Sequence, residues 1–432
     1  MQIGFSQHDI TPHANAFGAF RLSGVKRHSG VHDPLFAHAL ALRQDQQTCL
    51  LISLDVVAIP QAEADEAKAR IARAAGIEPA GILIAATHTH NGPETLNEEE
   101  DPRIRVWPAI HQALVTAATE AVGRLVDGHV HWATRDLPIA TNRYQHRLGQ
   151  GENTIDPQLD VLVFEGVNRE HLGVLYHYAA HPTCAMAAEY RISGDYCALA
   201  DRIIEERSGG FSMFLNGACG DINLEVGERT FARAEERAEE VAEAVLAATA
   251  GPKTAAVTEL AWANQTVSVG IKRAPSDLVP PPQLGQWQDA LEQARASEWQ
   301  DVIADPERQR ACFHQYQSYR TTLWKLFLRE RFGERPTEDV PLQCIRMGPL
   351  VLVAIPGELF IEHQLRLQQR FPDQRVLIVG YANAYAGYIP TAEAMAHATY
   401  ETQATLMHRV DGQAGDRLMG AATEMIQSEL RA

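Results

Sequence analysis

Two histidines spaced i, i+2 at the end of an apolar run are the residues of this sequence best suited to chemistry. His88 and His90 follow the apolar segment 82–86, within Thr87-His-Thr-His-Asn-Gly-Pro93. In an extended segment alternate side chains share one face, so both imidazoles can point into one cavity. A single His-x-His pair is weak evidence for a metal, because two polar residues at a strand end are the commoner explanation. The pair therefore predicts a metal site only if further ligands lie elsewhere in the chain.

Three more apolar segments end in residues that can bind a metal or transfer a proton. They are His181 after the segment 172–175, Asp221 after 211–215, and Glu358 after 350–355. Repetition of one pattern at four strand ends strengthens the prediction of a metal site beyond what the histidine pair alone supports.

The elements that must position these residues alternate between strand and helix in the first half of the chain. Apolar periodicity predicts strands over 48–59 and 81–86, and helices over 61–75 and 105–125. The remaining expected elements are strands over 160–165, 172–178, 211–215, 342–346, 351–355 and 375–379, and helices over 196–207, 230–248 and after Gly357. This order predicts an α/β protein with mixed central β-sheets flanked by helices.

The segment 274–336 differs from the rest of the chain in its proline content and in the spacing of its aromatic residues. Pro280-Pro-Pro282 precedes two stretches in which aromatic residues recur at helical spacing. We predict a helical insertion over about 274–336 inside a single domain spanning 1–432, because no linker or internal repeat marks a second domain. Aromatic residues at this spacing are more often core than substrate contacts, and a cap over a pocket is the alternative.

Composition excludes several functional classes. The net charge of −17 and the pI near 5.5 disfavour nucleic acid and anionic membranes, which reward clustered Lys and Arg. No apolar run approaches the roughly 20 residues that span a bilayer, and the amino-terminal residues lack a signal-peptide pattern. The six cysteines are scattered, which disfavours a disulfide framework and a thiolate zinc site. We expect a cytoplasmic enzyme with a small-molecule substrate and no stable membrane insertion; homo-oligomerisation stays open.

Five motifs in one order resemble the catalytic domain of the neutral/alkaline (non-lysosomal) ceramidases. They are Thr-His-Thr-His-Asn-Gly-Pro at 87–93, Ala-Ala-His-Pro-Thr at 179–183, Asn-Gly-Ala-Cys-Gly-Asp-Ile-Asn at 216–223, Pro-Gly-Glu at 356–358, and the segment 382–394 with Tyr400-Glu401. The amino-terminal Asp9-Ile-Thr-Pro12 matches as well. Each motif alone is weak, but the order and approximate spacing hold over nearly the whole chain.

The resemblance implies a zinc enzyme that cleaves an amide bond with metal-activated water. In that family one Zn²⁺ is held by two histidines, a glutamate and a tyrosine, which correspond here to His88, His181, Glu358 and Tyr388. Imidazole and carboxylate donors suit Zn²⁺, whereas tyrosine is a less common ligand. Water on such a metal has a pKa lowered to about 7 and becomes a nucleophile at neutral pH.

The same resemblance implies roles for three further side chains. His90 would act as the acid/base, or it is merely packed beside the metal. Arg143 would hold a substrate oxygen or the tetrahedral oxyanion, with a surface ion pair as the alternative, and Tyr400 would donate to the carbonyl oxygen. Asp221 and Asp55 are candidates to orient a ligand histidine through its second nitrogen, or else they are turn or capping residues.

The chain also departs from the family pattern. Where the ceramidases read Gly-Asp-Val-Ser-Pro, this chain reads Gly220-Asp-Ile-Asn-Leu224, so Asn223 excludes a serine nucleophile at that position. We expect neither a signal peptide nor the carboxy-terminal immunoglobulin-like domain of the family. The expected function is zinc-dependent hydrolysis of a linear amide bond in a small, non-ceramide substrate. The alternatives are an esterase or lactonase, a metal-dependent lyase or isomerase, and a non-catalytic metal-binding sensor.

Overall fold

The computed structural model describes most of the chain. The described residues are 1–428 except 13–27, 97–105, 187–189, 225–226, 254, 258, 274–324, 327, 330 and 334–335. The helical insertion predicted over 274–336 therefore lies almost entirely outside the described residues. Within it, 325–326, 328–329 and 331–332 are helical.

A nine-stranded sheet forms the centre of the protein. Eight strands follow the order β11-β9-β8-β6-β1-β3-β4-β5, and β13 pairs with β6. The bounds are β1 (Gln2–Asp9), β3 (Phe36–Gln44), β4 (Gln47–Leu54), β5 (Ile82–Ala86), β6 (Val126–Asp136), β8 (Gln158–Gly166), β9 (His171–Tyr178), β11 (Phe211–Asn216) and β13 (Ala255–Ala256). The pairs β4–β5 and β9–β11 are parallel, and the other pairs are antiparallel.

A second sheet of four strands has the order β14-β15-β16-β18. Its strands are β14 (Leu260–Gly270), β15 (Thr337–Met347), β16 (Leu350–Ala354) and β18 (Arg375–Val379), with only β16–β18 parallel. Three short pairs complete the described strands: β2 (Gly30–Val31) with β10 (Arg191–Ile192), β7 (Ala140–Asn142) with β12 (Ile222–Leu224), and β17 (Glu358–Leu359) with β19 (Tyr388–Ile389). The two sheets thus mix parallel and antiparallel pairing, as expected for a mixed α/β fold.

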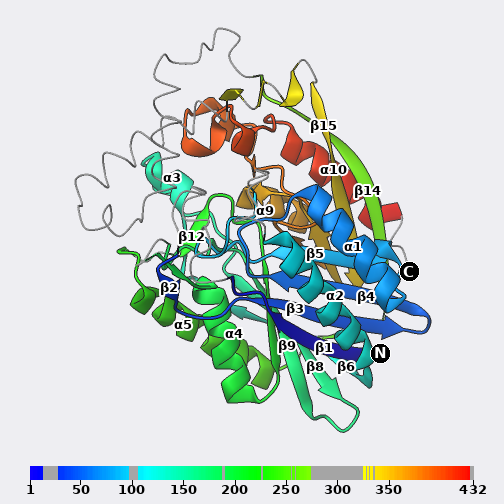
Figure 1. The fold of residues 1–432 in the computed structure, drawn as a ribbon. Helices are drawn as coiled ribbons and strands as arrows, with labels where there is room; N and C mark the ends of the chain where they lie inside the picture. The colour runs from blue at the N-terminus through cyan, green and yellow to red at the C-terminus, as the bar shows by residue number, and fades with distance from the viewer. Residues whose placement is uncertain are drawn as a thin grey trace.

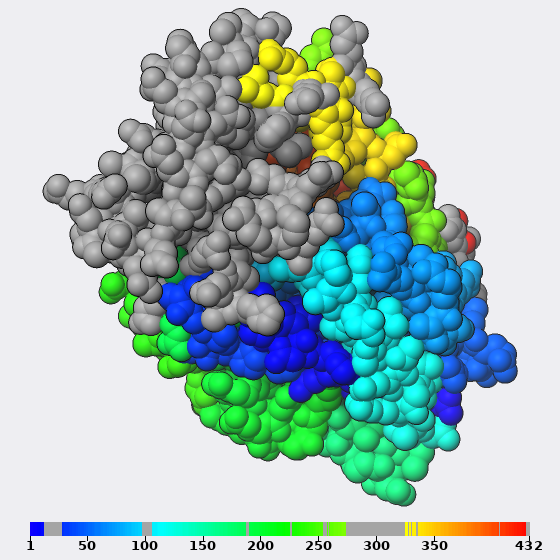
Figure 2. All heavy atoms as spheres, viewed as in Figure 1, coloured from blue at the N-terminus to red at the C-terminus, as the bar shows by residue number. Residues whose placement is uncertain are grey.

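Helices cover the outer face of each sheet (Figure 1). The helices are α1 (Gln61–Ala75), α2 (Trp107–Gly123), α3 (Arg143–Arg147), α4 (Asp195–Ser208), α5 (Phe231–Ala250), α9 (Ile361–Arg370) and α10 (Ala414–Ser428). In the same view, the side chains of α1 and α2 form a continuous blue-to-cyan outer surface (Figure 2). The helix expected after Gly357 begins only at Ile361, because Glu358 and Leu359 pair with β19 instead.

Strand alternation explains why two layers of sheet and two layers of helix form. Leu51 of β4 and Leu352 of β16 belong to one buried core between the sheets. The adjacent residues Ile52 and Val353 point the other way, into the core shared with the helices. Both faces of each sheet are therefore apolar, which requires covering on both sides. The predicted α/β class with mixed sheets flanked by helices is confirmed.

The large sheet curls until its two end strands meet. Asn216 at the end of β11 donates from Nδ2 to the carbonyl oxygen of Thr87, just after β5, at 3.0 Å. The second sheet joins the same place, where the Gly380 N–H donates to the Asn216 carbonyl at 3.0 Å. A Cβ on Gly380 would lie 2.8 Å from the Gly217 carbonyl oxygen, so this close approach requires glycine. The carboxyl ends of β5, β11 and β18 therefore converge.

No helix among the described residues combines the length and apolarity that a bilayer span requires. Five cysteines are buried and form no disulfide: Cys49, Cys184, Cys197, Cys219 and Cys344. The sixth, Cys312, lies outside the described residues.

Candidate active site

His88 lies two residues after β5 in an unusual backbone conformation. Its φ is 72°, a left-handed value that costs a non-glycine residue of the order of 1–3 kcal/mol and must be held by its surroundings. Its N–H donates to the Val56 carbonyl at 3.0 Å, and its ring Nδ1 to the Val57 carbonyl at 2.5 Å. Asp55 accepts hydrogen bonds from the Phe36 N–H and the Thr87 hydroxyl. Asp55 therefore fixes the approach to His88 and does not orient its ring, contrary to one expectation.

His181 is oriented by backbone carbonyls as well. Its Nδ1 donates to the Cys219 carbonyl at 2.5 Å. Asp221, expected as a candidate partner of a ligand histidine, instead accepts from the Ile361 N–H at 2.9 Å and from Asn142 Nδ2 at 2.7 Å. Of the two alternatives for Asp221, the capping role is the one observed: its carboxylate caps α9 and ties that helix to β7, and it does not orient a histidine.

Glu358 and Tyr388, thirty residues apart, become neighbours through strand pairing. They are register partners in the parallel pair β17–β19, so their side chains leave the same face. The Tyr385 hydroxyl donates to Glu358 Oε1 at 2.5 Å. The other carboxylate oxygen, Oε2, lies 3.0 Å from His181 Nε2 and 3.6 Å from His88 Nε2.

These contacts place hydrogen-bond acceptors face to face. The Nδ1 atoms of His88 and His181 face carbonyl oxygens, which only accept, so each Nδ1 carries the proton and each Nε2 is a bare acceptor. Burial lowers the pKa of His88 to about 3 and holds that of His181 well below its ordinary value, so both rings are neutral. Two proton sources lie beside them: His90 Nε2 is 3.2 Å from His88 Nε2, and burial raises the pKa of Glu358, so its carboxyl can hold a proton toward His181 Nε2. A metal cation would take the place of these protons and satisfy the facing acceptors at once.

His90 completes the cluster. Its Nε2 lies 3.2 Å from His88 Nε2, and its Nδ1 has no hydrogen-bond partner among the described residues. The ligand atoms of His88, His90 and His181 lie within 4.8 Å of one another, so these three histidines could hold a metal ion. His90 is thus placed either as a third ligand or as the neighbouring acid/base. The acid/base role stays a prediction.

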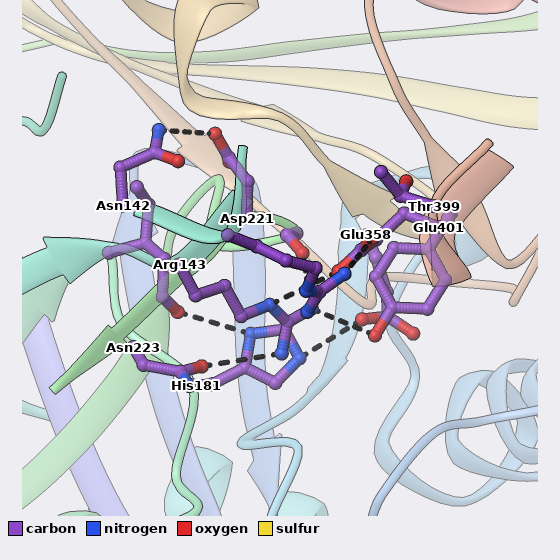
Figure 3. A network of polar contacts seen from close by, with 12 residues as sticks. Asn142, Arg143, His181, Asp221, Asn223, Glu358, Thr399 and Glu401 are labelled. Atoms are coloured by element: carbon purple, nitrogen blue, oxygen red, sulfur yellow. Dashed lines mark hydrogen bonds and ion pairs between the residues drawn. The ribbon is translucent and has the colours of Figure 1, made fainter. Parts of the chain in front are cut away.

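Arg143 begins α3, directly after β7 pairs with β12, and that pairing brings it to the cluster. Its guanidinium donates to the Gly220 carbonyl at 2.6 Å, to the Tyr388 hydroxyl at 3.0 Å and to Asn223 Oδ1 at 3.3 Å. Figure 3 shows Arg143 between Asn223 and Glu401, with His181 and Glu358 beside it. The side chain is 19% exposed, so the alternative of a surface ion pair is wrong.

Tyr400 lies at the outer edge of the cluster. It begins the 3-10 helix η5 (Tyr400–Thr402) and is 39% exposed. Its ring meets the rings of Tyr388 and His408 edge-on, with centroids 5.7 and 4.6 Å away. His408 also stacks on Tyr388 at 5.0 Å. All seven residues predicted for the site thus lie together, and their individual roles stay predictions.

Three residues of the site were not predicted from the sequence. They are Tyr385, which donates to Glu358; Tyr381, whose ring stacks on His88 with centroids 3.9 Å apart; and Glu401, which contacts Arg143. The first two lie in the tyrosine-rich segment 381–388, where spacing does not distinguish one phenol from another. Glu401 follows Tyr400 in one of the family motifs, and the only sequence signal for it is that it is an acidic residue beside a candidate site residue.

The fold and the site define an α/β protein with a buried cluster of three imidazoles and a carboxylate that could hold a metal ion. The sequence profile described as "Neutral/alkaline non-lysosomal ceramidase, N-terminal" matches residues 1–242. The chain belongs to this family, as the motifs had indicated, and with it to the hydrolases that act on an amide bond.

Relatives extend the likeness beyond the matched half. The neutral ceramidase of Pseudomonas aeruginosa is 25% identical over 468 aligned residues, covering 94% of this chain and 69% of the relative. The neutral ceramidase of Mycobacterium tuberculosis is 41% identical over 78 residues, 17% of this chain.

Solved structures share the fold. The crystal structure of the Pseudomonas aeruginosa neutral ceramidase has a TM-score of 0.76 at 20% identity, covering all of this chain and 75% of that one. A structure described as a ceramidase complexed with C2 has a TM-score of 0.75 at 19% identity, covering 99% of this chain and 75% of that one.

Proposed function

We propose that this protein is a zinc-dependent amidohydrolase that cleaves the amide bond of a ceramide-like N-acyl amine. The observation that carries the proposal is a buried cluster in which the Nε2 atoms of His88 and His181 face Glu358 Oε2. Arg143, Tyr388 and Tyr400 lie beside this cluster. Amide hydrolysis needs a nucleophile, a group that stabilises the oxyanion and a proton donor for the amine. This cluster offers a group suited to each need.

The donor set fits Zn²⁺. His88, His181, Glu358 and Tyr388 would hold the ion, and within the described part of the chain no cysteine joins the histidine cluster, so these donors make an N/O site of the kind found in catalytic zinc centres. When bound, zinc supplies a Lewis acid and lowers the pKa of a coordinated water to about 7.

The chain's own residues account for orientation and proton transfer. Arg143 and Tyr400 would hold the carbonyl oxygen of the substrate, where negative charge develops as the carbonyl carbon becomes tetrahedral. His90 would take a proton from the attacking water and return it to the departing nitrogen. Burial keeps the pKa of His90 well below its ordinary value, so its ring is neutral before the reaction. Asn223 has no nucleophilic oxygen, which argues against an acyl-enzyme at this position.

The substrate proposal differs from the expectation drawn from sequence. A small, non-ceramide substrate finds no support in the comparisons, because the aligned relatives are named neutral ceramidases and one covers 94% of this chain. A ceramide-like N-acyl amine is therefore the substrate class that we propose.

The test compares matched substrates on zinc-reconstituted protein. A fluorescent short-chain N-acyl sphingosine should be cleaved to one fatty acid and one amine, and cleavage should stop on chelation and return with zinc. In H₂¹⁸O, a single labelled oxygen should enter the fatty acid in each turnover. The corresponding O-acyl ester and a lactone serve as controls.

Each outcome separates the candidates. Cleavage of only the ester or lactone would identify an esterase or lactonase, and an unsaturated or rearranged product would identify a lyase or isomerase. Zinc binding without turnover of any substrate would favour a sensor. A covalent acyl adduct found by mass spectrometry during turnover would overturn the water mechanism.

A further inference from the structure

Glu401 is a fully buried carboxylate that contacts two arginines. Its side chain is 0% exposed; Oε2 accepts from Arg147 at 2.8 Å, and Oε1 lies 3.5 Å from Arg143 Nε. A buried carboxylate costs several kcal/mol in lost hydration unless cations and donors compensate. Burial opposes ionisation here, but the two guanidinium groups outweigh it, and the pKa of Glu401 lies below its ordinary value. The ion triad is therefore charged and internally compensated.

The geometry gives the two arginines different surroundings. Arg147 is 44% exposed, and its guanidinium donates to Glu401 Oε2 at 2.8 Å. Arg143 Nε lies 3.5 Å from Glu401 Oε1, an ion pair in which neither atom makes a hydrogen bond within the described part of the chain, and both terminal nitrogens meet the Gly220 carbonyl, Asn223 and Tyr388 in the site. A guanidinium is a rigid planar fork, so an ionic attraction at its Nε edge favours one direction for the nitrogens on the other edge.

Glu401 belongs to the same short helix as Tyr400. The two residues are adjacent in η5, which Thr399 and Thr402 cap reciprocally. The amine of Lys272 holds the next part of the chain by donating to the carbonyls of Thr402, Gln403 and His408. The carboxylate thus links α3, which carries Arg143, to the segment that carries Tyr400, alongside the hydrogen bond from the Tyr144 hydroxyl to the Ala394 carbonyl at 3.0 Å.

We infer that Glu401 is a positioning residue: it aims the terminal nitrogens of Arg143 into the site and keeps Tyr400 in register with them. The inference rests on the proposed function, because these two side chains are the ones expected to hold the substrate oxygen. The alternative is that Glu401 only fastens η5 to α3. In that case, replacing Glu401 or replacing Arg147 should change kcat by the same small amount.

The matched variants are Glu401→Gln and Arg147→Met. A glutamine has the same shape, but it lacks the negative charge that attracts Arg143, and its NH₂ group would face the guanidinium of one arginine, which is also a donor. We expect Glu401→Gln to lower kcat on the short-chain N-acyl sphingosine by about 10-fold or more, with a smaller change in KM. Arg147→Met should stay within about twofold of wild type, although both variants lose thermal stability. Zinc content should be unchanged in both.

Two further measurements distinguish positioning from fastening. On an Arg143→Met background, Glu401→Gln should cost less than about threefold, because residues that act through one another are non-additive. Phenylglyoxal modification of Arg143, mapped by mass spectrometry, should accelerate in Glu401→Gln and not in Arg147→Met. If Glu401→Gln fails to fold, Glu401→Asp keeps the charge, withdraws it from Arg143 and should show a smaller kcat loss.

Equal kcat and equal Arg143 labelling in the Glu401 and Arg147 variants would overturn the inference. Additive costs in the double variant would do the same. The labelling experiment requires no turnover, so an absence of hydrolysis by the wild-type protein would refute the proposed function and still leave the role of Glu401 decided.

Discussion

Tyr385→Phe should weaken zinc binding without touching any proposed ligand. The Tyr385 hydroxyl donates to Glu358 Oε1 at 2.5 Å, which leaves Oε2 as the oxygen turned toward His88 and His181. Glu358 is 1% exposed, so water cannot easily replace the lost donor. A hydrogen bond to a charged group is worth about 1.5–3 kcal/mol, and 1.4 kcal/mol corresponds to tenfold in affinity. We therefore expect zinc binding to weaken by about 10- to 100-fold, the usual scale for partners of metal ligands.

The assay is competition between the apo-protein and a chromophoric chelator of known zinc affinity. Tyr381→Phe is the matched control: its hydroxyl lies 3.1 Å from Cys219 Sγ, not at a proposed ligand, and its ring remains to stack on His88. Unfolding of both apo-variants shows whether either has lost its fold. If Tyr385→Phe binds zinc as tightly as wild type, the carboxylate is oriented by something else and the reasoning fails. Equal weakening in Tyr381→Phe would show that any buried hydroxyl loss disturbs the centre.

Three other outcomes are expected. His88→Ala and His181→Ala should each abolish stoichiometric zinc, measured by metal analysis; unchanged zinc in both would remove them from the ligand set. His90→Ala should keep zinc and lose about 10²-fold or more in turnover, the scale of a positioned acid/base, whereas joint loss of zinc would make His90 a ligand. His38 is buried, and burial lowers its pKa to about 4 from an ordinary 6.5, so the unfolded chain binds more protons between those values. Stability should therefore fall as pH drops from about 6.5 to 4, by about 3 kcal/mol from this group, and denaturant unfolding of His38→Phe should lack that component; an unchanged pH profile would contradict it.

Local sequence patterns were sufficient to predict most helices and strands and the types of residue that lie at the site. Strands such as β5 and β16 are short, continuous apolar runs, and a buried strand needs no partner to be recognised by that composition. His88 and Glu358 stand just beyond their ends, so their candidacy follows from chain position alone. The helix expected after Gly357 is confirmed as α9, but its start at Ile361 depends on the pairing of β17 with β19, a long-range contact that periodicity does not encode.

The orientation of each side chain depended on contacts between distant segments. Asp55 and Asp221 were reasonable partners for histidines by type, yet carbonyl oxygens occupy both Nδ1 positions and the two carboxylates hold backbone and Asn142 instead. The contacts of Tyr385 and Glu401 were not predicted for the same reason: the residues next to them in the sequence do not indicate a carboxylate or an arginine across the site.

By itself, the sequence determined the α/β class, the family and the set of residues that could bind a metal, because these depend on composition, periodicity and motif order along the chain. Only the tertiary structure decided that β5 and β11, at opposite ends of one sheet, meet, and that Glu358 Oε2 faces two bare imidazole nitrogens. The physical reason is that sheet curl and hydrogen-bond direction arise from packing over the whole chain, whereas a motif specifies only which groups are available to be packed.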